Sequence, residues 1–152
     1  MRVVMRSLLG ITATVVLAGC GGGSGEGLDA NGRPIEEGGA DAPLAPTLAS
    51  LQQNVFTPAC TGCHAGASAP QGLRLDAANS YAMLVGVPSV EVPGLLRVAP
   101  GNPAASYLVQ KLEGNAAVGA RMPLGGPFLD AATIAVVRQW IAAGALRGPA
   151  QP

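Results

Sequence analysis

The chain has 152 residues and no formal net charge, and it is 49% hydrophobic with 3% aromatic residues. This length indicates one domain with appendages. The balance of 9 basic against 9 acidic side chains lacks the basic stripe typical of nucleic-acid binding, so we expect no nucleic-acid partner. Much of the apolar content is alanine, which buries little area. A core of these side chains alone would be thin, and a bound apolar cofactor would complete it.

Residues 1–19 predict a secretory signal, with a basic start and an apolar stretch over residues 8–18 that is too short to span a membrane. The tetrapeptide Leu17-Ala18-Gly19-Cys20 resembles the bacterial lipoprotein box. The resemblance implies cleavage before Cys20, lipidation of its thiol and a membrane anchor. Gly21, which stands where an aspartate would signal inner-membrane retention, implies an outer-membrane lipoprotein facing the periplasm or the cell surface. An ordinary signal peptide with an incidental cysteine is the alternative.

Residues 20–43 predict a flexible tether. The segment is Gly-rich, nearly free of large apolar residues, and carries five acidic side chains against Arg33 alone. Such a composition does not offset the entropy of ordering. The folded head then covers residues 44–152, where basic side chains slightly outnumber acidic ones.

The head begins with a predicted helix. Leu48, Leu51, Val55 and Phe56 fall on one helical face, residues 52–54 lie largely off it, and Pro58 is expected to end the helix.

The motif Cys60-Thr61-Gly62-Cys63-His64 follows at once and is typical of covalent c-type haem attachment. Two thiols add across the two haem vinyl groups, and an imidazole one residue later reaches the iron. His64 is the only histidine in the chain, so no other imidazole competes for that position. We therefore predict one covalent haem c on Cys60 and Cys63, with His64 as the first axial ligand.

Three other interpretations of the motif remain open. A structural zinc site needs four ligands, and the motif supplies three, with Cys20 claimed by the lipid signal. A thioredoxin-like dithiol is expected within a βαβ unit, and this helical pattern lacks one. A disulfide between Cys60 and Cys63 would leave His64 without a role.

Further helices are predicted after the motif. A weak pattern covers residues 77–85, and a short helix covers residues 106–112 after a Pro- and Gly-rich turn. The last helix begins near Asp130, a good N-cap, and ends near Gly144, with Ile134, Val137 and Ile141 on one stripe beside Trp140. No run alternates clearly enough to predict a strand, so we expect an all-α fold.

Over residues 44–146 the head resembles a class I, mono-haem cytochrome c domain. The resemblance is carried by the haem motif, by Phe56 four positions before the first haem cysteine, by Met122-Pro123 in a later loop and by Trp140 in a C-terminal helix. It implies a small helical fold around one haem, with a methionine as second axial ligand and a C-terminal helix that crosses the first. The chain departs from the family in having no glycine before Phe56 in the first helix.

Two methionines remain once Met1 and Met5 leave with the signal, namely Met83 and Met122. Met83 lies in a helical pattern, where a core role is expected, whereas Met122 lies in a Gly- and Pro-rich loop that can bring a thioether onto the iron. We predict Met122 as the sixth ligand. Arg97 lies among apolar residues and needs a half-buried partner, for which a haem propionate is the candidate.

The predicted function is one-electron transfer between redox proteins, with no substrate site and no catalytic residues. The alternative is a haem-containing subunit or domain of an oxidoreductase, or a haem sensor, with an exchangeable sixth ligand. The chain has no second histidine to act as a distal acid–base group. The motif also lies near the start of the head, whereas helical-bundle cytochromes with five-coordinate haem carry it near the end.

Overall fold

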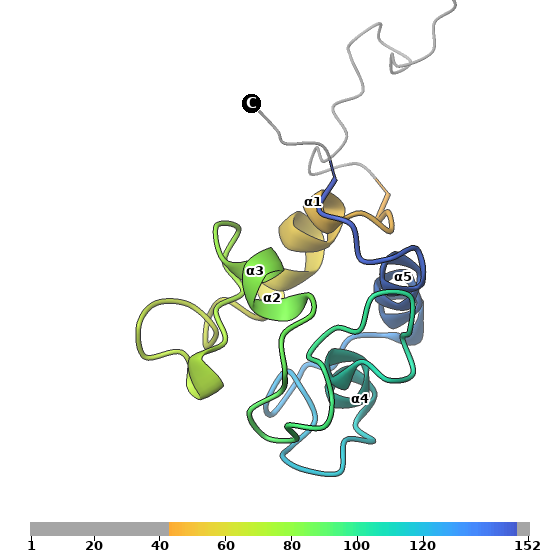
Figure 1. Cartoon of the computed structure of the whole chain (residues 1–152). Coiled ribbons are helices and arrows are strands. Elements are labelled where there is room, and N and C mark those ends of the chain that lie inside the picture. Colours follow the sequence, from red (N-terminus) through yellow and green to blue (C-terminus); the bar gives the residue numbers. More distant parts are fainter. Residues whose placement is uncertain (1–42, 149–152) are drawn as a thin grey trace, which may run out of the picture. The chain divides into compact units, whose positions relative to one another are not determined.

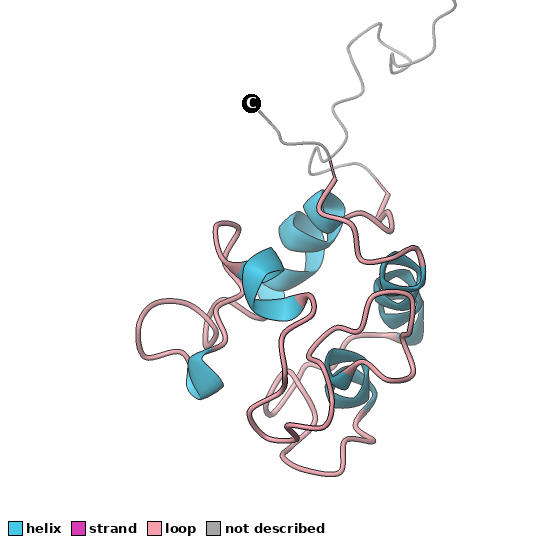
Figure 2. Cartoon of the chain, in the orientation of Figure 1, coloured by secondary structure: helices cyan, strands magenta, loops and turns pink. Residues whose placement is uncertain are grey.

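In the part of the head that the structure describes, helices are the only regular elements (Figure 2). The structure, a computed structural model, describes residues 43–148. The predicted signal peptide, Cys20 and all of the predicted tether except Pro43 lie outside this range. The elements, in chain order, are α1 (Leu48–Leu51), η1 (Gln52–Phe56), α2 (Thr57–Ala59), η2 (Pro70–Gly72), α3 (Ser80–Leu84), α4 (Tyr107–Glu113) and α5 (Ala131–Ala142) (Figure 1).

The described residues contain no strand and only three isolated β-bridges, which tie Val85, Pro88 and Leu96 to later parts of the chain. The prediction of an all-α class is therefore confirmed. Among the described helices, none has the length and apolar character needed to span a bilayer.

The first three elements form one continuous helical stretch that leads to the motif. It starts at Thr47, whose hydroxyl accepts a hydrogen bond from Ser50 N at 3.2 Å. The middle segment, η1, is a π-helix, a wider turn that often marks functional sites. The prediction that Pro58 ends the helix was wrong by one residue. Pro58 lies inside this continuous stretch, in α2, and the helix continues to Ala59.

The last two helices follow the sequence prediction closely. Asp130 Oδ1 accepts a hydrogen bond from Thr133 N at 2.6 Å and caps α5 as expected. The α4 helix ends at Gly114, whose φ of 82° is the left-handed conformation that glycine adopts without strain. The two helices α4 and α5 pack against each other. The weak prediction over residues 77–85 corresponds to the shorter helix α3.

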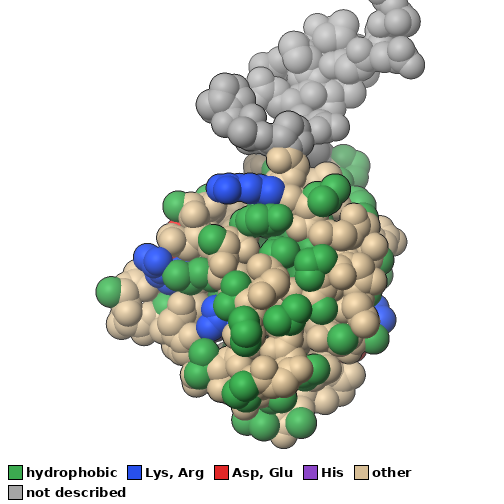
Figure 3. Space-filling model, viewed as in Figure 1, with side chains coloured by type: hydrophobic (Ala, Val, Ile, Leu, Met, Phe, Trp, Pro, Cys, Tyr) green, Lys and Arg blue, Asp and Glu red, His purple; other side chains and the backbone are tan. Residues whose placement is uncertain are grey.

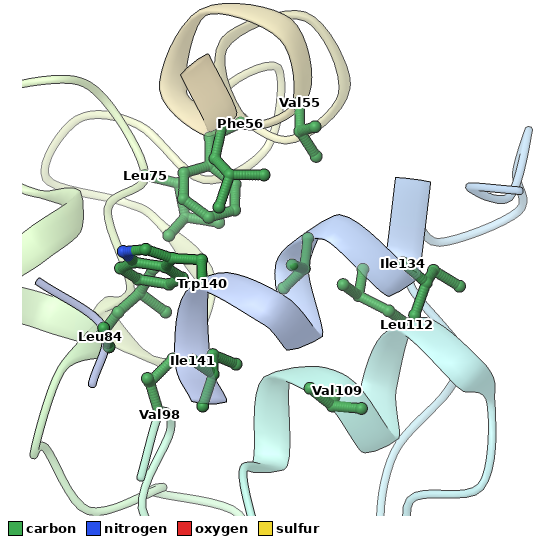
Figure 4. Packing of buried hydrophobic residues seen from close by; sticks show 13 residues of the cluster. Val55, Phe56, Leu75, Leu84, Val98, Val109, Leu112, Ile134, Trp140 and Ile141 are labelled. Carbon is green, nitrogen blue, oxygen red and sulfur yellow. The ribbon is translucent and has the colours of Figure 1, made fainter. Parts of the chain in front are cut away.

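One hydrophobic core joins the first helical stretch to α4 and α5. Figure 4 shows Phe56 and Leu75 next to each other, with Trp140 below them. The indole of Trp140 is buried, and its N–H is satisfied by Leu146 O at 3.0 Å. The predicted apolar stripes of the first and last helices lie in this core, whose buried members are Leu51, Val55, Phe56, Leu75, Leu84, Val98, Val109, Leu112, Ile134, Val137, Trp140, Ile141 and Ala145.

Candidate functional site

The motif residues form one tight turn at the end of α2. Cys60 N and Thr61 N both donate to Phe56 O, at 2.9 and 3.1 Å, so the turn is anchored on a buried residue of the π-helix. Cys60 O then accepts from Cys63 N at 3.2 Å and from His64 N at 2.8 Å. These bonds close the backbone of the motif into one compact turn that carries Cys60, Cys63 and His64.

The imidazole of His64 is held by a backbone carbonyl. Its Nδ1 lies 3.1 Å from Leu73 O. A carbonyl oxygen only accepts hydrogen bonds, so in a neutral imidazole this contact favours the tautomer with the proton on Nδ1 and the lone pair on Nε2. The same segment is bound again through Leu75 N, which donates to His64 O at 2.7 Å. Orientation of a histidine by its second ring nitrogen is the usual arrangement for a metal ligand.

The two thiols differ in their surroundings. Both are free in the structure, with Cys63 exposed and Cys60 half-buried. Burial raises the pKa of the Cys60 thiol from 9.0 to about 11, because the thiolate loses solvation there. Cys60 Sγ lies 3.8 Å from Val55 O. Within residues 43–148, no cluster of three or more His, Cys, Asp and Glu side chains is arranged to hold a metal ion.

The side chains of Arg97 and Met83 contact the segment of residues 71–74, which carries the carbonyl that binds His64. Arg97 donates from its two terminal nitrogens to Met83 O and to Gln71 O, both at 2.9 Å. Arg74 N donates to the sulfur of Met83 at 3.2 Å. Burial lowers the pKa of Arg97, since its charge is partly removed from water. The partners that Arg97 needs in its apolar setting are therefore backbone carbonyls, and its pairing with a propionate stays a prediction.

Gln52 is a site residue that the sequence analysis missed. It was expected to lie largely off the apolar face, yet it is 9% exposed. Its amide donates to Leu75 O at 2.8 Å and accepts from the Ser80 hydroxyl at 2.6 Å. Its spacing is the signal that would have found it, because Gln52 stands four residues after Leu48 and four before Phe56 and so shares their helical face.

Met122 lies in the loop between α4 and α5. Its amide donates to Lys111 O at 2.9 Å, and the neighbouring Arg121 Nε donates to Leu112 O at 2.9 Å. The described hydrogen bonds of Met122 lead to α4, and none of them joins it to the motif turn. Met83 lies in α3, and its sulfur accepts a hydrogen bond from Arg74 N, so its predicted helical position is confirmed. The core role expected for it was wrong, because Met83 is half-buried and lies outside the hydrophobic core.

The loop that carries Met122 also exposes apolar surface. Leu124 is 71% and Phe128 is 49% exposed, and the Arg121 guanidinium lies 4.3 Å from the centre of the Phe128 ring. Figure 3 shows apolar side chains spread over one face of the head, interleaved with basic ones. Apolar surface of this kind is suited to contact with a cofactor or a partner protein.

Two cavities open to solvent lie beside α4 and α5, with volumes of about 250 and about 320 Å³. Both are lined by Glu113 and Arg138, which form an exposed ion pair at 3.0 Å. Neither is lined by Cys60, Cys63 or His64. The ligand chemistry lies at the motif turn, and that turn is the candidate site.

No protein-family model, curated protein or solved structure matches the chain.

Proposed function

We propose that the protein is an electron carrier, a c-type cytochrome with one covalently bound haem. The observation that carries the proposal is the motif turn, in which His64 Nδ1 lies 3.1 Å from Leu73 O, a contact that favours the neutral tautomer with the lone pair on Nε2. Two free thiols stand on the same turn, four and one residues before this imidazole. This donor set fits thioether attachment at Cys60 and Cys63 with axial ligation by His64.

A bound haem would supply one-electron chemistry at its iron. The residues of the chain would then hold and orient the haem. His64 binds through Nε2, and the bond from its Nδ1–H to Leu73 fixes the plane of the ring and raises the basicity of the ligand. Phe56 and Trp140, buried in one core, keep water from the end of the helix that carries the turn.

Met122 is the sixth ligand in this proposal, and Arg97 pairs with a haem propionate. Arg97 offers further N–H groups beyond the two that bind Met83 and Gln71, because a guanidinium carries five donors. A thioether ligand favours the ferrous state and raises the reduction potential relative to ligation by two imidazoles. On this proposal the helical head is a small cytochrome c-like fold around the haem.

The setting we propose is an outer-membrane lipoprotein that faces the periplasm or the cell surface. Lipidated Cys20 is its anchor, residues 20–43 are its tether, and its partners are redox proteins. More than one acyl chain is needed for stable residence in a membrane, and lipoproteins of this kind carry several.

The test is whether the haem stays with the polypeptide after denaturation. The full chain, produced in a host that matures c-type cytochromes, should keep its haem through acid–acetone extraction and stain for haem on a denaturing gel. Cys60→Ala combined with Cys63→Ala should abolish the stain. Cys20→Ser is the matched control, because it removes a cysteine outside the motif. That variant should keep the haem and leave the membrane fraction. Release of free haem from the unmodified chain would refute the proposal.

Carbon monoxide separates the electron carrier from its alternative. If Met122 stays on the iron, the reduced protein should be inert to carbon monoxide. Prompt binding would favour a subunit of an oxidoreductase, or a sensor, with an exchangeable sixth ligand.

A further inference from the structure

A cluster of polar side chains lies between α4 and the loops on either side of it. Lys111 Nζ lies 3.0 Å from Glu91 Oε2, and the Tyr107 hydroxyl lies 3.1 Å from the same oxygen. Tyr107 is 5% and Lys111 is 7% exposed. Lys111 is also the only lysine in the chain. The hydrogen bond from Lys111 is the main reason that the pKa of Glu91 is lowered, so the Glu91 carboxylate is ionised at neutral pH.

The cluster makes hydrogen bonds to the loop that leads to Met122. The Tyr107 hydroxyl lies 2.6 Å from Val118 O, and Lys111 Nζ lies 3.4 Å from the same oxygen. Gly119 packs directly against the ion pair with a φ of 75°. A Cβ at Gly119 would lie 2.2 Å from Lys111 Nζ and 2.6 Å from Glu91 Oε1. Any larger residue at this position would displace the ends of both side chains, and it would adopt a positive φ that glycine adopts without strain.

The same helix binds the far end of the loop. Lys111 O accepts from Met122 N at 2.9 Å, and Leu112 O accepts from Arg121 Nε at 2.9 Å. Lys111 thus holds the loop at two points, through its side chain near Val118 and through its carbonyl at Met122. Because Glu91 comes from the preceding loop, the cluster also joins two connections that are distant in sequence.

We propose that Glu91, Tyr107 and Lys111 are positioning residues that hold the loop of residues 114–122 against α4 and so fix the place of Met122. The consequence for the iron rests on the proposed function, in which Met122 is the sixth ligand. With haem bound, a held loop would keep the Met122 thioether in place as a ligand, and a loosened loop would not.

The test uses Tyr107→Phe and Glu91→Gln in the full chain, with Glu113→Gln as control. Tyr107→Phe removes one hydroxyl and keeps the buried ring, so it is the variant least disruptive to folding. Glu113→Gln removes the same charge as Glu91→Gln, but from the exposed pair with Arg138. Hydrogen exchange of the Met122 amide, which donates to Lys111 O, reports on the hold itself, whether or not a haem is present.

Exchange at this amide should accelerate about tenfold in Tyr107→Phe, which loses the buried hydrogen bond to Val118 O, and more in Glu91→Gln, which loses the charge that pairs with Lys111. The control should leave the exchange unchanged. Equal exchange in all four proteins would overturn the proposal, as would acceleration spread evenly over the whole head.

Spectroscopy then tests the link to the iron. With the loop loosened, the sulfur-to-iron absorption band of the oxidised protein should weaken, and the reduced protein should bind carbon monoxide faster than the control does. A full band and unchanged carbon monoxide binding in both variants, despite faster exchange, would overturn the part of the proposal that concerns ligation. If the unmodified chain shows neither haem nor the band, the proposed function fails. The exchange data still decide whether the cluster holds the loop.

Discussion

Replacing Gln52 with leucine should destabilise the head while keeping its hydrophobic face. Gln52 lies in the π-helical segment and joins three parts of the structure. Its amide nitrogen donates to Leu75 O at 2.8 Å, and its amide oxygen accepts from the Ser80 hydroxyl at 2.6 Å. Leucine has a similar volume but cannot make either bond, so both partners lose their hydrogen bond to this side chain.

The size of the effect follows from the burial of those partners. Ser80 is 1% and Leu75 is 3% exposed, so water reaches neither group without local opening. A buried polar group left without its partner costs about 1–3 kcal/mol. Against two such losses, the extra apolar surface of leucine returns about 1–2 kcal/mol. The free energy of unfolding should therefore fall by about 2 kcal/mol, a large share of the ~5–15 kcal/mol typical of a folded domain.

Urea unfolding of the purified chain measures this loss, with Gln53→Leu as the matched control. Gln53 is the next residue in the same helical segment and is exposed. The control should stay within about 0.5 kcal/mol of the unmodified protein. In a double-mutant cycle with Ser80→Ala, the two losses should be less than additive, because the two residues share one bond. Equal stability of Gln52→Leu and Gln53→Leu would refute the reasoning.

Three further outcomes are expected. Met122→Ala should abolish the sulfur-to-iron band and lower the reduction potential, whereas Met83→Ala should keep the band and lower the stability measured by urea unfolding; the reverse result would contradict the ligand assignment. Glu91 has a lowered pKa, so its contribution to stability is full above the ordinary glutamate value of 4.5 and is lost as the pH falls through the lower folded value. Acid unfolding of Glu91→Gln should therefore depend less on pH than that of the unmodified chain. Arg97→Gln should loosen the segment that holds His64 and accelerate its hydrogen exchange; unchanged exchange would contradict this role.

The helices predicted best are those whose local signals agree with their packing. In α5 a capping aspartate, an apolar stripe at helical spacing and a closing glycine all indicate the same element, and the structure has it at Ala131–Ala142. The first helix was predicted less well. The apolar face was correct, but the polar identity of Gln52 hid its position on that face. A buried glutamine is recognised only once its partners in other elements are known.

The motif turn could be predicted because its chemistry depends on short spacing. The groups that bind that turn could not be predicted from the sequence. Leu73 O and Gln71 O are backbone groups, and any residue supplies a carbonyl, so no side chain in the sequence marks them. The cluster of Glu91, Tyr107 and Lys111 is similarly hidden, since its ion pair joins residues twenty positions apart across two loops.

The last prediction concerns the two motif thiols in a chain that carries no haem. A thiol reacts with an alkylating reagent as its thiolate, and burial raises the pKa of Cys60 from 9.0 to about 11. At pH 8 the thiolate population of Cys60 should thus be about 100-fold smaller than that of an unperturbed thiol. Cys63 is exposed and should be labelled first.

The experiment uses the Cys20→Ser chain from a host without c-type maturation, with far-UV circular dichroism to verify the helices. Iodoacetamide at pH 8 should modify Cys63 before Cys60, and urea should remove the difference. Because the folded pKa is raised, the unfolded chain ionises first, so the stability of this haem-free chain should fall as the pH rises from 9.0 to about 11. Equal labelling rates in the folded chain would show that Cys60 is not shielded. In the chain with covalent haem neither cysteine should react even in urea, because both sulfurs are then thioethers and have no thiolate form.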